Sequence, residues 1–323
     1  MTAITATTKT TTSPASDLLR TSDLGAEQLE QLLELAAEMK ADKRGWVDAF
    51  RGETLAMLFD KPSTRTRVSL ATAAARLGMT PLPLHQDELQ TGRGETVADT
   101  GRALSAYVAA ITIRTFAHES VVELAAAATV PVVNALTDKH HPCQALADLL
   151  TLKEHFGALA GLKVAYVGDG NNVAHSLMEA GALAGMTVAV AAPVQYEPLP
   201  EVTASATALA EANGGAIVVT DDLLEAIEGA DAVYTDVWIS MGDEAEREER
   251  LGALAGYQVN VELMALASKD AIFLHCLPAH REEEVTAEVL DGPRSHVWQQ
   301  AANRLPTQQA LLYSLISGQV GQT

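Results

Sequence analysis

Three hydroxyl side chains and two guanidinium groups occur within five consecutive residues, Ser63-Thr64-Arg65-Thr66-Arg67. The apolar run 54–59 before them predicts a buried strand, and residues 68–77 after them predict a helix that ends at Gly78. The first N–H groups of a helix have no intrahelical partner and carry the positive end of its dipole. Hydroxyls and arginines at such a turn are suited to bind a phosphate. The alternative is a capping residue beside two surface arginines, and the interleaved pattern favours the anion site.

The overall charge makes Arg65 and Arg67 conspicuous. The chain has 323 residues, 48% of them hydrophobic, and a formal net charge of −20. We expect no nucleic-acid or anionic-membrane partner, and no apolar run is long enough to span a membrane. Residues 1–16 are Thr-rich and lack the apolar core of a secretory signal, so we expect a disordered extension. The two cysteines, Cys143 and Cys276, favour a reducing compartment, the cytoplasm, without disulfides.

Two further motifs combine histidine with cysteine. His141-Pro142-Cys143-Gln144 opens a predicted helix, and His275-Cys276-Leu277-Pro278 closes a predicted strand. Together they contain enough ligand types for a zinc site. The spacing of structural zinc sites is absent from both motifs, so we expect no metal.

A glycine-containing turn, Gly168-Asp169-Gly170-Asn171-Asn172-Val173, follows another predicted strand. It carries only the first two glycines of the dinucleotide fingerprint, and the next strand ends without an acidic residue, so we expect no NAD and no other cofactor. The asparagines can hold a carboxylate or an α-amino group, although capping of the helix competes for one of them. The segment Asp236–Gly242 also follows a strand, and its Asp and Ser should face the same cleft unless Asp236 only caps a turn.

Alternating strands and helices must position these motifs. The pattern predicts strands at 54–59, 80–84, 109–114 and 130–135, then a long helix at 142–156, then strands at 162–168, 187–191, 216–220, 232–235 and 271–275, and a last helix at 308–317. The predicted fold is α/β, with two similar domains, each a mainly parallel sheet flanked by helices, linked by a long helix and a C-terminal crossing helix. We expect the first domain to cover 17–151, joined by a C-terminal helix at 304–323, and the second to cover 152–303. The site should lie at the carboxyl ends of the strands.

Four of these motifs carry a resemblance to a known family. Ser63-Thr64-Arg65-Thr66-Arg67 and His141-Pro142-Cys143-Gln144 resemble the two signatures that aspartate and ornithine carbamoyltransferases share. The segments Asp236-x-Trp238-x-Ser240-Met241-Gly242 and His275-Cys276-Leu277-Pro278 resemble the pair found in the ornithine enzymes. The resemblance covers nearly the whole chain beyond about Asp17, with the motifs in the family's order.

The resemblance implies transfer of a carbamoyl group from carbamoyl phosphate to L-ornithine, without metal or cofactor. The first domain would bind carbamoyl phosphate and the second ornithine. Gln90 would reach the phosphate of a neighbouring subunit in a homotrimer. Arg304 matches the family's late arginine, although Ala302 and Pro306 beside it depart from the commoner pattern. The implied catalytic residues are Arg114, His141, Gln144, Cys276 and Arg304; those for carbamoyl phosphate add Ser63, Thr64, Arg65, Thr66, Gln90 and Leu277; those for ornithine are Asn172, Asp236, Ser240 and Met241.

Two other functions remain open. One is a carbamoyltransferase for a different amine, such as putrescine or an N-acylated ornithine. The Ser240-Met241-Gly242 segment favours ornithine, because a free amino-acid end needs polar partners. The other is a non-catalytic protein that binds a phosphorylated metabolite on the same fold, against which the set Arg114, His141, Gln144 and Cys276 argues.

Overall fold

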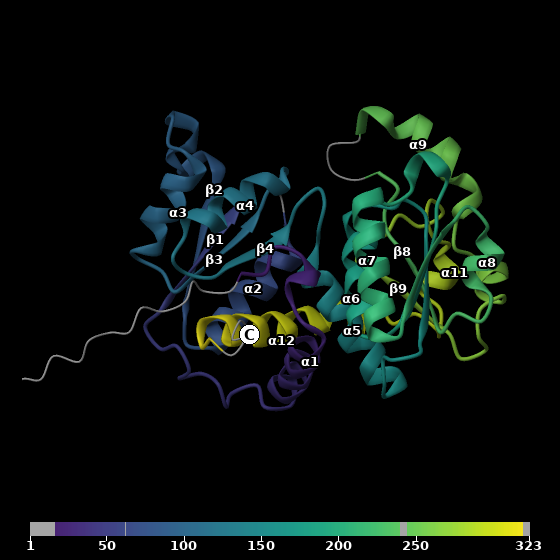
Figure 1. Cartoon of the computed structure of the whole chain (residues 1–323), viewed down its shortest axis with the longest axis horizontal. Coiled ribbons are helices and arrows are strands. Elements are labelled where there is room, and N and C mark those ends of the chain that lie inside the picture. The colour runs from purple at the N-terminus through teal and green to yellow at the C-terminus, as the bar shows by residue number, and fades with distance from the viewer. Residues whose placement is uncertain (1–16, 62, 240–243, 319–323) are drawn as a thin grey trace, which may run out of the picture.

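The computed structural model describes residues 17–61, 63–239 and 244–318, and within these it leaves the side chains of 86, 91, 92 and 244 undescribed. Two parallel sheets form the frame (Figure 1). The first has the order β2-β1-β3-β4 and the second the order β7-β6-β5-β8-β9. This arrangement confirms the predicted fold class. The strands are β1 (Thr54–Phe59), β2 (Thr80–His85), β3 (Ala110–Arg114), β4 (Val132–Leu136), β5 (Lys163–Val167), β6 (Thr187–Ala191), β7 (Ala216–Thr220), β8 (Ala232–Thr235) and β9 (Ile272–His275).

Helices cover both faces of each sheet, as parallel sheets require (Figure 1). No helix of the described residues has both the length and the apolarity to cross a bilayer. The α-helices are α1 (Ala26–Ala41), α2 (Arg65–Arg76), α3 (Val97–Ser105), α4 (His118–Ala127), α5 (Pro142–Phe156), α6 (Asn172–Leu183), α7 (Pro200–Asn213), α8 (Leu223–Ile227), α9 (Arg247–Leu254), α10 (Val261–Met264), α11 (Ala287–Leu290) and α12 (Val297–Ile316). Short 3-10 turns are η1 (Thr21–Asp23), η2 (Gln86–Glu88), η3 (Gln90–Arg93), η4 (Val194–Tyr196), η5 (Glu244–Glu246) and η6 (Ala255–Tyr257).

Strand composition follows strand position in the sheet. In β1, which lies between two neighbours, Leu55 to Phe59 are all buried. In β2, at the edge, most residues are partly or fully exposed, and Pro81 and Pro83 occur there. Proline cannot donate to the ladder, so an edge strand is where it is tolerated.

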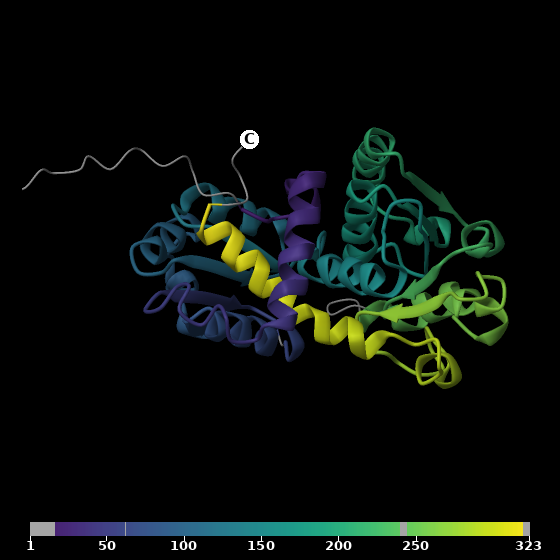
Figure 2. The same cartoon turned by 90° about the horizontal axis from the view of Figure 1, so that it is seen from below.

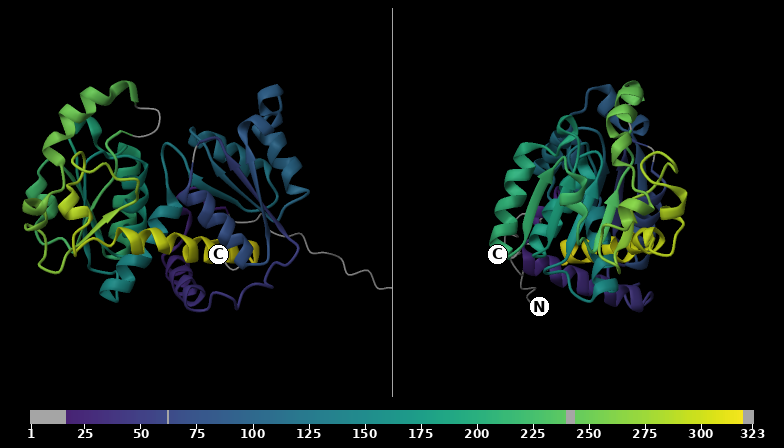
Figure 3. Two further views of the ribbon diagram at one scale, coloured as in Figure 1. Left: turned by 180° about the vertical axis from the view of Figure 1, so that it is seen from behind. Right: turned by 90° about the vertical axis from the view of Figure 1, so that its right-hand side faces the viewer.

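Two helices join the halves. α5 is buried along most of its length, and α12 contacts α1, α2, α5 and β9. Figures 2 and 3 show α12 running along the first domain and reaching the near edge of the second. The expected start of this helix, at Gln308, was wrong, because the helix begins at Val297 and contains Pro306 in its interior. Buried residues recur on both sides of Pro306, so tertiary packing holds the helix through the proline.

The connections at the carboxyl ends of the strands place the site. In the first sheet β1 leads into α2, beside the end of β3. In the second sheet β5 leads into α6, and β8 and β9 end next to it. Neighbouring parallel strands whose connections diverge open a crevice at this edge. The same edge of each sheet therefore supplies side chains to the space between the domains.

Candidate active site

A cavity of about 1060 Å³ lies between the two domains. Its lining comes from the loops that follow β1, β3 and β4 in the first domain and β5, β8 and β9 in the second. The structure therefore brings most of the predicted site residues together. Those that line the cavity are Ser63, Thr64, Arg65, Thr66, Arg114, His141, Asn172, Asp236, Cys276, Leu277 and Arg304.

The segment 63–67, which the sequence predicts to bind phosphate, lies at the N-terminus of α2, and this helix starts at Arg65. The Thr64 side chain makes no capping hydrogen bond, so the simple capping interpretation is not supported for this residue. The Arg65 guanidinium Nη2 donates to the backbone oxygen of Leu277 across the cleft, at 2.5 Å. Arg67 is half-buried and does not line the cavity. The first domain thus presents free helix-end N–H groups, hydroxyls and one arginine to the cleft.

Arg114, His141 and Arg304 converge behind this segment. All three are nearly fully buried. Burial and the nearby Arg304 charge lower the pKa of Arg114 to about 10, and burial with both arginines holds the pKa of His141 well below its usual range. Arg114 is therefore a cation at neutral pH and His141 is a neutral imidazole. Arg114 Nε, Arg304 Nε and His141 Nδ1 have no hydrogen-bond partner in the described part of the chain.

Gln144 lies one layer deeper and does not line the cavity. Its Oε1 accepts from Arg304 Nη1 at 2.5 Å, and its Nε2 donates to Asp148 Oδ1 at 2.8 Å. Arg304 Nη2 donates to Thr66 Oγ1 at 2.9 Å, which connects α12 to the start of α2. A buried network thus fixes the donors that face the cavity.

The second domain presents a thiol and a carboxylate. Cys276 Sγ donates to Asp236 Oδ1 at 2.8 Å. Burial, followed by the Asp236 charge, raises the pKa of Cys276 well above its usual value, so this cysteine is a thiol and not a thiolate nucleophile. Asn171 Nδ2 donates to the other oxygen of Asp236 at 3.0 Å.

The sequence left open which of the two adjacent asparagines caps α6 and which one faces the site. Asn171 is the N-cap of α6, and its Oδ1 accepts from Val173 N at 2.9 Å. Asn172 lines the cavity, and its Nδ2 donates to the Thr137 carbonyl at 2.5 Å. Asn171 also lines the cavity, so capping and a role in the site coexist in one residue.

The structure does not assemble the zinc set that the sequence contains. Cys143 is buried in α5 with its thiol toward the Asn134 carbonyl at 3.6 Å, outside the cavity lining. Asp236, His275 and Cys276 do lie within metal-ligand reach of one another. Both His275 ring nitrogens are engaged, however: Nδ1 accepts from Leu277 N at 2.8 Å, and Nε2 lies 3.2 Å from Glu284 Oε1.

Two predicted site residues in the described part of the chain, Gln90 and Gln144, do not line this cavity. Gln90 lies in η3, is exposed and does not line the cavity of its own chain. Ser240 and Met241 lie outside the described residues, as does the expected extension 1–16.

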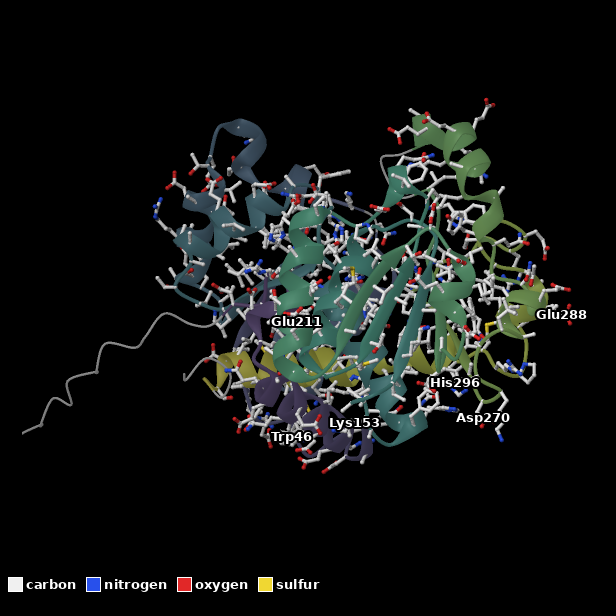
Figure 4. All side chains as sticks on the ribbon, turned by 45° about the vertical axis from the view of Figure 1, so that its right-hand side comes forward. Trp46, Lys153, Glu211, Asp270, Glu288 and His296 are labelled. Carbon is white, nitrogen blue, oxygen red and sulfur yellow. The ribbon has the colours of Figure 1, made fainter. Side chains whose placement is uncertain are left out.

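Several site residues were missed at the level of sequence. Asp148 accepts a hydrogen bond from the Gln144 amide, and Gln300 accepts one from the His275 backbone N–H. Glu284 accepts from His280 N at 2.5 Å, next to the His275 loop. Asp169 and Arg250 form a largely buried ion pair of 3.0 Å that ties α9 to the β5 loop. One available signal was the Gln144–Asp148 spacing, because residues four apart share a helix face. By contrast, surface acids such as Glu211 and Glu288 lie on the outside of the molecule (Figure 4).

Comparison with known proteins agrees with this geometry. The family model for the carbamoyl-phosphate-binding domain of aspartate/ornithine carbamoyltransferases matches residues 16–154, and the model for the aspartate- or ornithine-binding domain matches residues 160–315. The ornithine carbamoyltransferase of Bacillus subtilis is 56% identical over 300 residues, 93% of each chain. That of Anoxybacillus flavithermus is 56% identical over 302 residues, covering 93% of this chain and 96% of the relative.

Solved structures of ornithine carbamoyltransferases are also similar to this chain. The ornithine carbamoyltransferase of Pyrococcus furiosus superposes with a TM-score of 0.90 at 50% identity, covering 95% of this chain and 99% of that one. The enzyme of Gloeobacter violaceus gives 0.85 at 46% identity, covering 94% and 100%. With matches to both domain models and to full-length relatives, the chain belongs to the aspartate/ornithine carbamoyltransferase family.

Proposed function

We propose that this chain transfers the carbamoyl group of carbamoyl phosphate to the δ-amino group of L-ornithine, giving L-citrulline and phosphate. One observation carries the proposal: buried cationic and neutral donors on the first domain face a thiol–carboxylate pair on the second across one cavity. Relatives named for this activity, at 56% identity over most of the chain, support it. Neither metal nor cofactor is needed for the steps below.

The first domain binds carbamoyl phosphate in this proposal. Its phosphate rests on the N–H groups at the start of α2, with Ser63, Thr64 and Thr66 hydroxyls and the Arg65 guanidinium around it. The carbamoyl group then lies against Arg114, His141 and Thr66, with Gln144 and Arg304 behind. Leu277 and Cys276 close the site from the other domain. The cluster of arginines offsets the phosphate charge within a strongly acidic chain.

The second domain holds the amino-acid end of ornithine. The Asp236 carboxylate is suited to the α-ammonium group and the Asn172 amide to the α-carboxylate, with Ser240 and Met241 as further partners. Cys276, as a thiol that donates to Asp236, orients the side-chain amine without forming a bond to it.

The chemistry follows from the charges. The δ-amine, with an ordinary pKa near ~10.4 by analogy with lysine, attacks only as the neutral base. Partial desolvation in the closed cleft favours that form. Attack on the carbonyl carbon forms a C–N bond and a tetrahedral oxyanion, which Arg114, His141 and Thr66 stabilise by hydrogen bonds. Collapse breaks the bond to phosphate oxygen, and the leaving phosphate takes the proton of the amine. Positioning and electrostatics supply the acceleration.

Assembly and location complete the proposal. The carbamoyl-phosphate domain covers 17–151 and the ornithine domain 152–303, with the C-terminal helix returning to the first. Gln90 is exposed and away from its own cavity, which supports a homotrimer in which it reaches a neighbour's phosphate. We place the enzyme in the cytoplasm, where its thiols stay reduced.

Purified protein, carbamoyl phosphate and one amine at a time test the function. L-ornithine should give L-citrulline, while putrescine and N-acetylornithine should give little product, because the first lacks the carboxylate and the second has a blocked α-amine. Preference for putrescine or the acylated amine would replace the substrate assignment. Binding of carbamoyl phosphate without turnover of any amine would favour the non-catalytic alternative.

A further inference from the structure

Five hydrogen bonds form one buried chain between the two domains. Thr66 at the start of α2 and Arg304 on α12 make the first link, at 2.9 Å, and Arg304 and Gln144 the second, at 2.5 Å. Gln144 then donates to Asp148 Oδ1 at 2.8 Å. Gln300 Nε2 donates to the same oxygen at 2.7 Å, and its Oε1 accepts from His275 N at 2.9 Å. Every member is at most 3% exposed.

Asp148 fixes the direction of this chain. Both glutamine amides donate to its Oδ1, which is an acceptor when the carboxyl is ionised and also when it carries its proton on Oδ2, so both amides must turn their NH₂ groups toward it. The Gln144 Oε1 then faces Arg304, and the Gln300 Oε1 faces the His275 N–H, both of which only donate. Without the central acceptor, a flipped Gln144 amide would present its NH₂ to the Arg304 guanidinium, where two donors cannot bond. Asp148 and Arg304 therefore select the same orientation of Gln144, and Asp148 is the partner that holds its NH₂ group in place.

The location of Asp148 is unfavourable for stability alone. It is fully buried in α5, and its Oδ2 makes no hydrogen bond of normal geometry to the described residues, although the Tyr234 hydroxyl lies beside the carboxyl group. Burying a carboxylate is costly, and an apolar residue in the same place would avoid the cost. Asp148 costs stability, yet it orients the amides of Gln144 and Gln300 near the cavity. We infer that this orientation is the reason for a carboxyl group at this position.

We propose that Asp148 is a positioning residue for the reaction: it holds the Gln144 amide so that the Gln144 oxygen fixes the Arg304 guanidinium, which lines the cavity. This inference rests on the proposed function. It assigns Asp148 no contact with substrate. Its effect reaches carbamoyl phosphate through Gln144 and then Arg304.

Four variants test the proposal. Asp148→Leu removes the acceptor at similar volume. Asp148→Asn keeps one oxygen, which is enough because both amides donate to Oδ1, and the neighbouring Tyr234 hydroxyl can accept from the new NH₂. Thr151→Val, one turn along α5, breaks an equally buried bond to α12, from Asn303 Nδ2 at 3.0 Å, outside the chain. Gln144→Ala, alone and with Asp148→Leu, asks whether Asp148 acts through Gln144.

Carbamoyl phosphate binding is measured by calorimetry without an amine, and kcat/KM with ornithine. Asp148→Leu should lose roughly 10- to 100-fold in both, whereas Asp148→Asn and Thr151→Val should stay within about threefold. Adding Asp148→Leu to Gln144→Ala should cause less than about a threefold further loss. If Asp148→Leu does not fold, judged by circular dichroism, Asp148→Ser, whose hydroxyl cannot reach both amides, must show the same selective loss.

Three results would overturn the proposal: wild-type carbamoyl phosphate binding in Asp148→Leu or its Ser substitute, an equal loss in Thr151→Val, or full additivity with Gln144→Ala. Failure of the proposed function is separate, because it shows as absence of citrulline from the wild-type enzyme. Carbamoyl phosphate binding still tests the role of Asp148 in that event, since it involves no amine.

Discussion

Arg65, Arg114 and Arg304 gather at one cavity in a chain whose net charge is −20. Their environments differ. Arg304 is held by Gln144 and Thr66 and Arg114 is nearly buried, whereas Arg65 is exposed and reaches across to Leu277. Arg114, with Arg304 behind it, is suited to act on the carbonyl oxygen, and the exposed Arg65 is suited to bind the phosphate.

Replacing Arg65 should therefore weaken the phosphate end. Arg65→Ala should raise the KM for carbamoyl phosphate and lower turnover, with a total loss of roughly 1.5–3 kcal/mol in transition-state stabilisation. Steady-state kinetics with each substrate varied in turn would measure it. Arg67→Ala is the matched control, because Arg67 lies two residues away on α2 and does not line the cavity. Equal kinetics for Arg65→Ala and the wild type would remove the phosphate site from this segment.

The burial of the Asp148 carboxyl also leads to a prediction about the pH dependence of stability. Burial raises its pKa from 3.8 to about 7. Between these two pH values the folded protein holds a proton that the unfolded chain has lost, so stability falls as the pH rises. The difference in unfolding free energy between wild type and Asp148→Asn should shift against the wild type by on the order of 4 kcal/mol between about pH 4 and pH 7, and then stay constant.

Urea titrations of both proteins at equal subunit concentration would measure this shift. A pH-independent difference would show that the Asp148 carboxyl stays ionised throughout.

At the scale of elements, apolar runs predicted the strands well, because parallel strands are buried on both faces. The strands β6, β7 and β8 have the predicted bounds. The start of α12 was missed, since packing against α1, α2 and α5 overrides the local effect of Pro306.

Local sequence patterns do not record long-range contacts, and this explains which site residues could be predicted. Ser63 to Thr66, His141 and Cys276 could be found because they sit in compact motifs at element ends. Gln300 could not, because its partner Asp148 is 152 residues away, and no local pattern records that contact.

The start of α6 offers a test at this scale. Asn171→Ala removes the N-cap, which typically costs about 1 kcal/mol of stability, and also removes a donor to Asp236. It should therefore raise the KM for ornithine. Asp222→Ala removes the comparable N-cap of α8, whose Oδ1 accepts from Leu224 N at 2.8 Å, and Asp222 does not line the cavity. Both variants should have a similarly lowered Tm in thermal unfolding, and only Asn171→Ala should change the KM for ornithine. A change of KM in both variants would show that the effect comes from lost stability.

At the scale of the whole molecule, the proposed trimer predicts complementation. Gln90→Ala and Arg114→Ala should each damage every site of their own homotrimers. In a mixed trimer, some interfaces join an intact Arg114 of one chain with an intact Gln90 of the next. Co-refolding the two variants should therefore give more activity than either parent.

Mixing the intact variant trimers without refolding is the control, and mass spectrometry would confirm the hybrids. Hybrid activity equal to the average of the parents would show that Gln90 acts within its own chain or not at all.

The path of α12 has a consequence for biosynthesis. Leu311, Leu312 and Leu315, near the end of the chain, belong to the same core as Leu33 of α1 and Leu70 of α2. A ribosome releases the N-terminal half of a protein first, and domains generally fold in that order. Here the first domain cannot complete its core until the last helix has been synthesised. Its apolar surface stays uncovered while the whole second domain is translated, and we expect the nascent chain to be prone to aggregation at this stage.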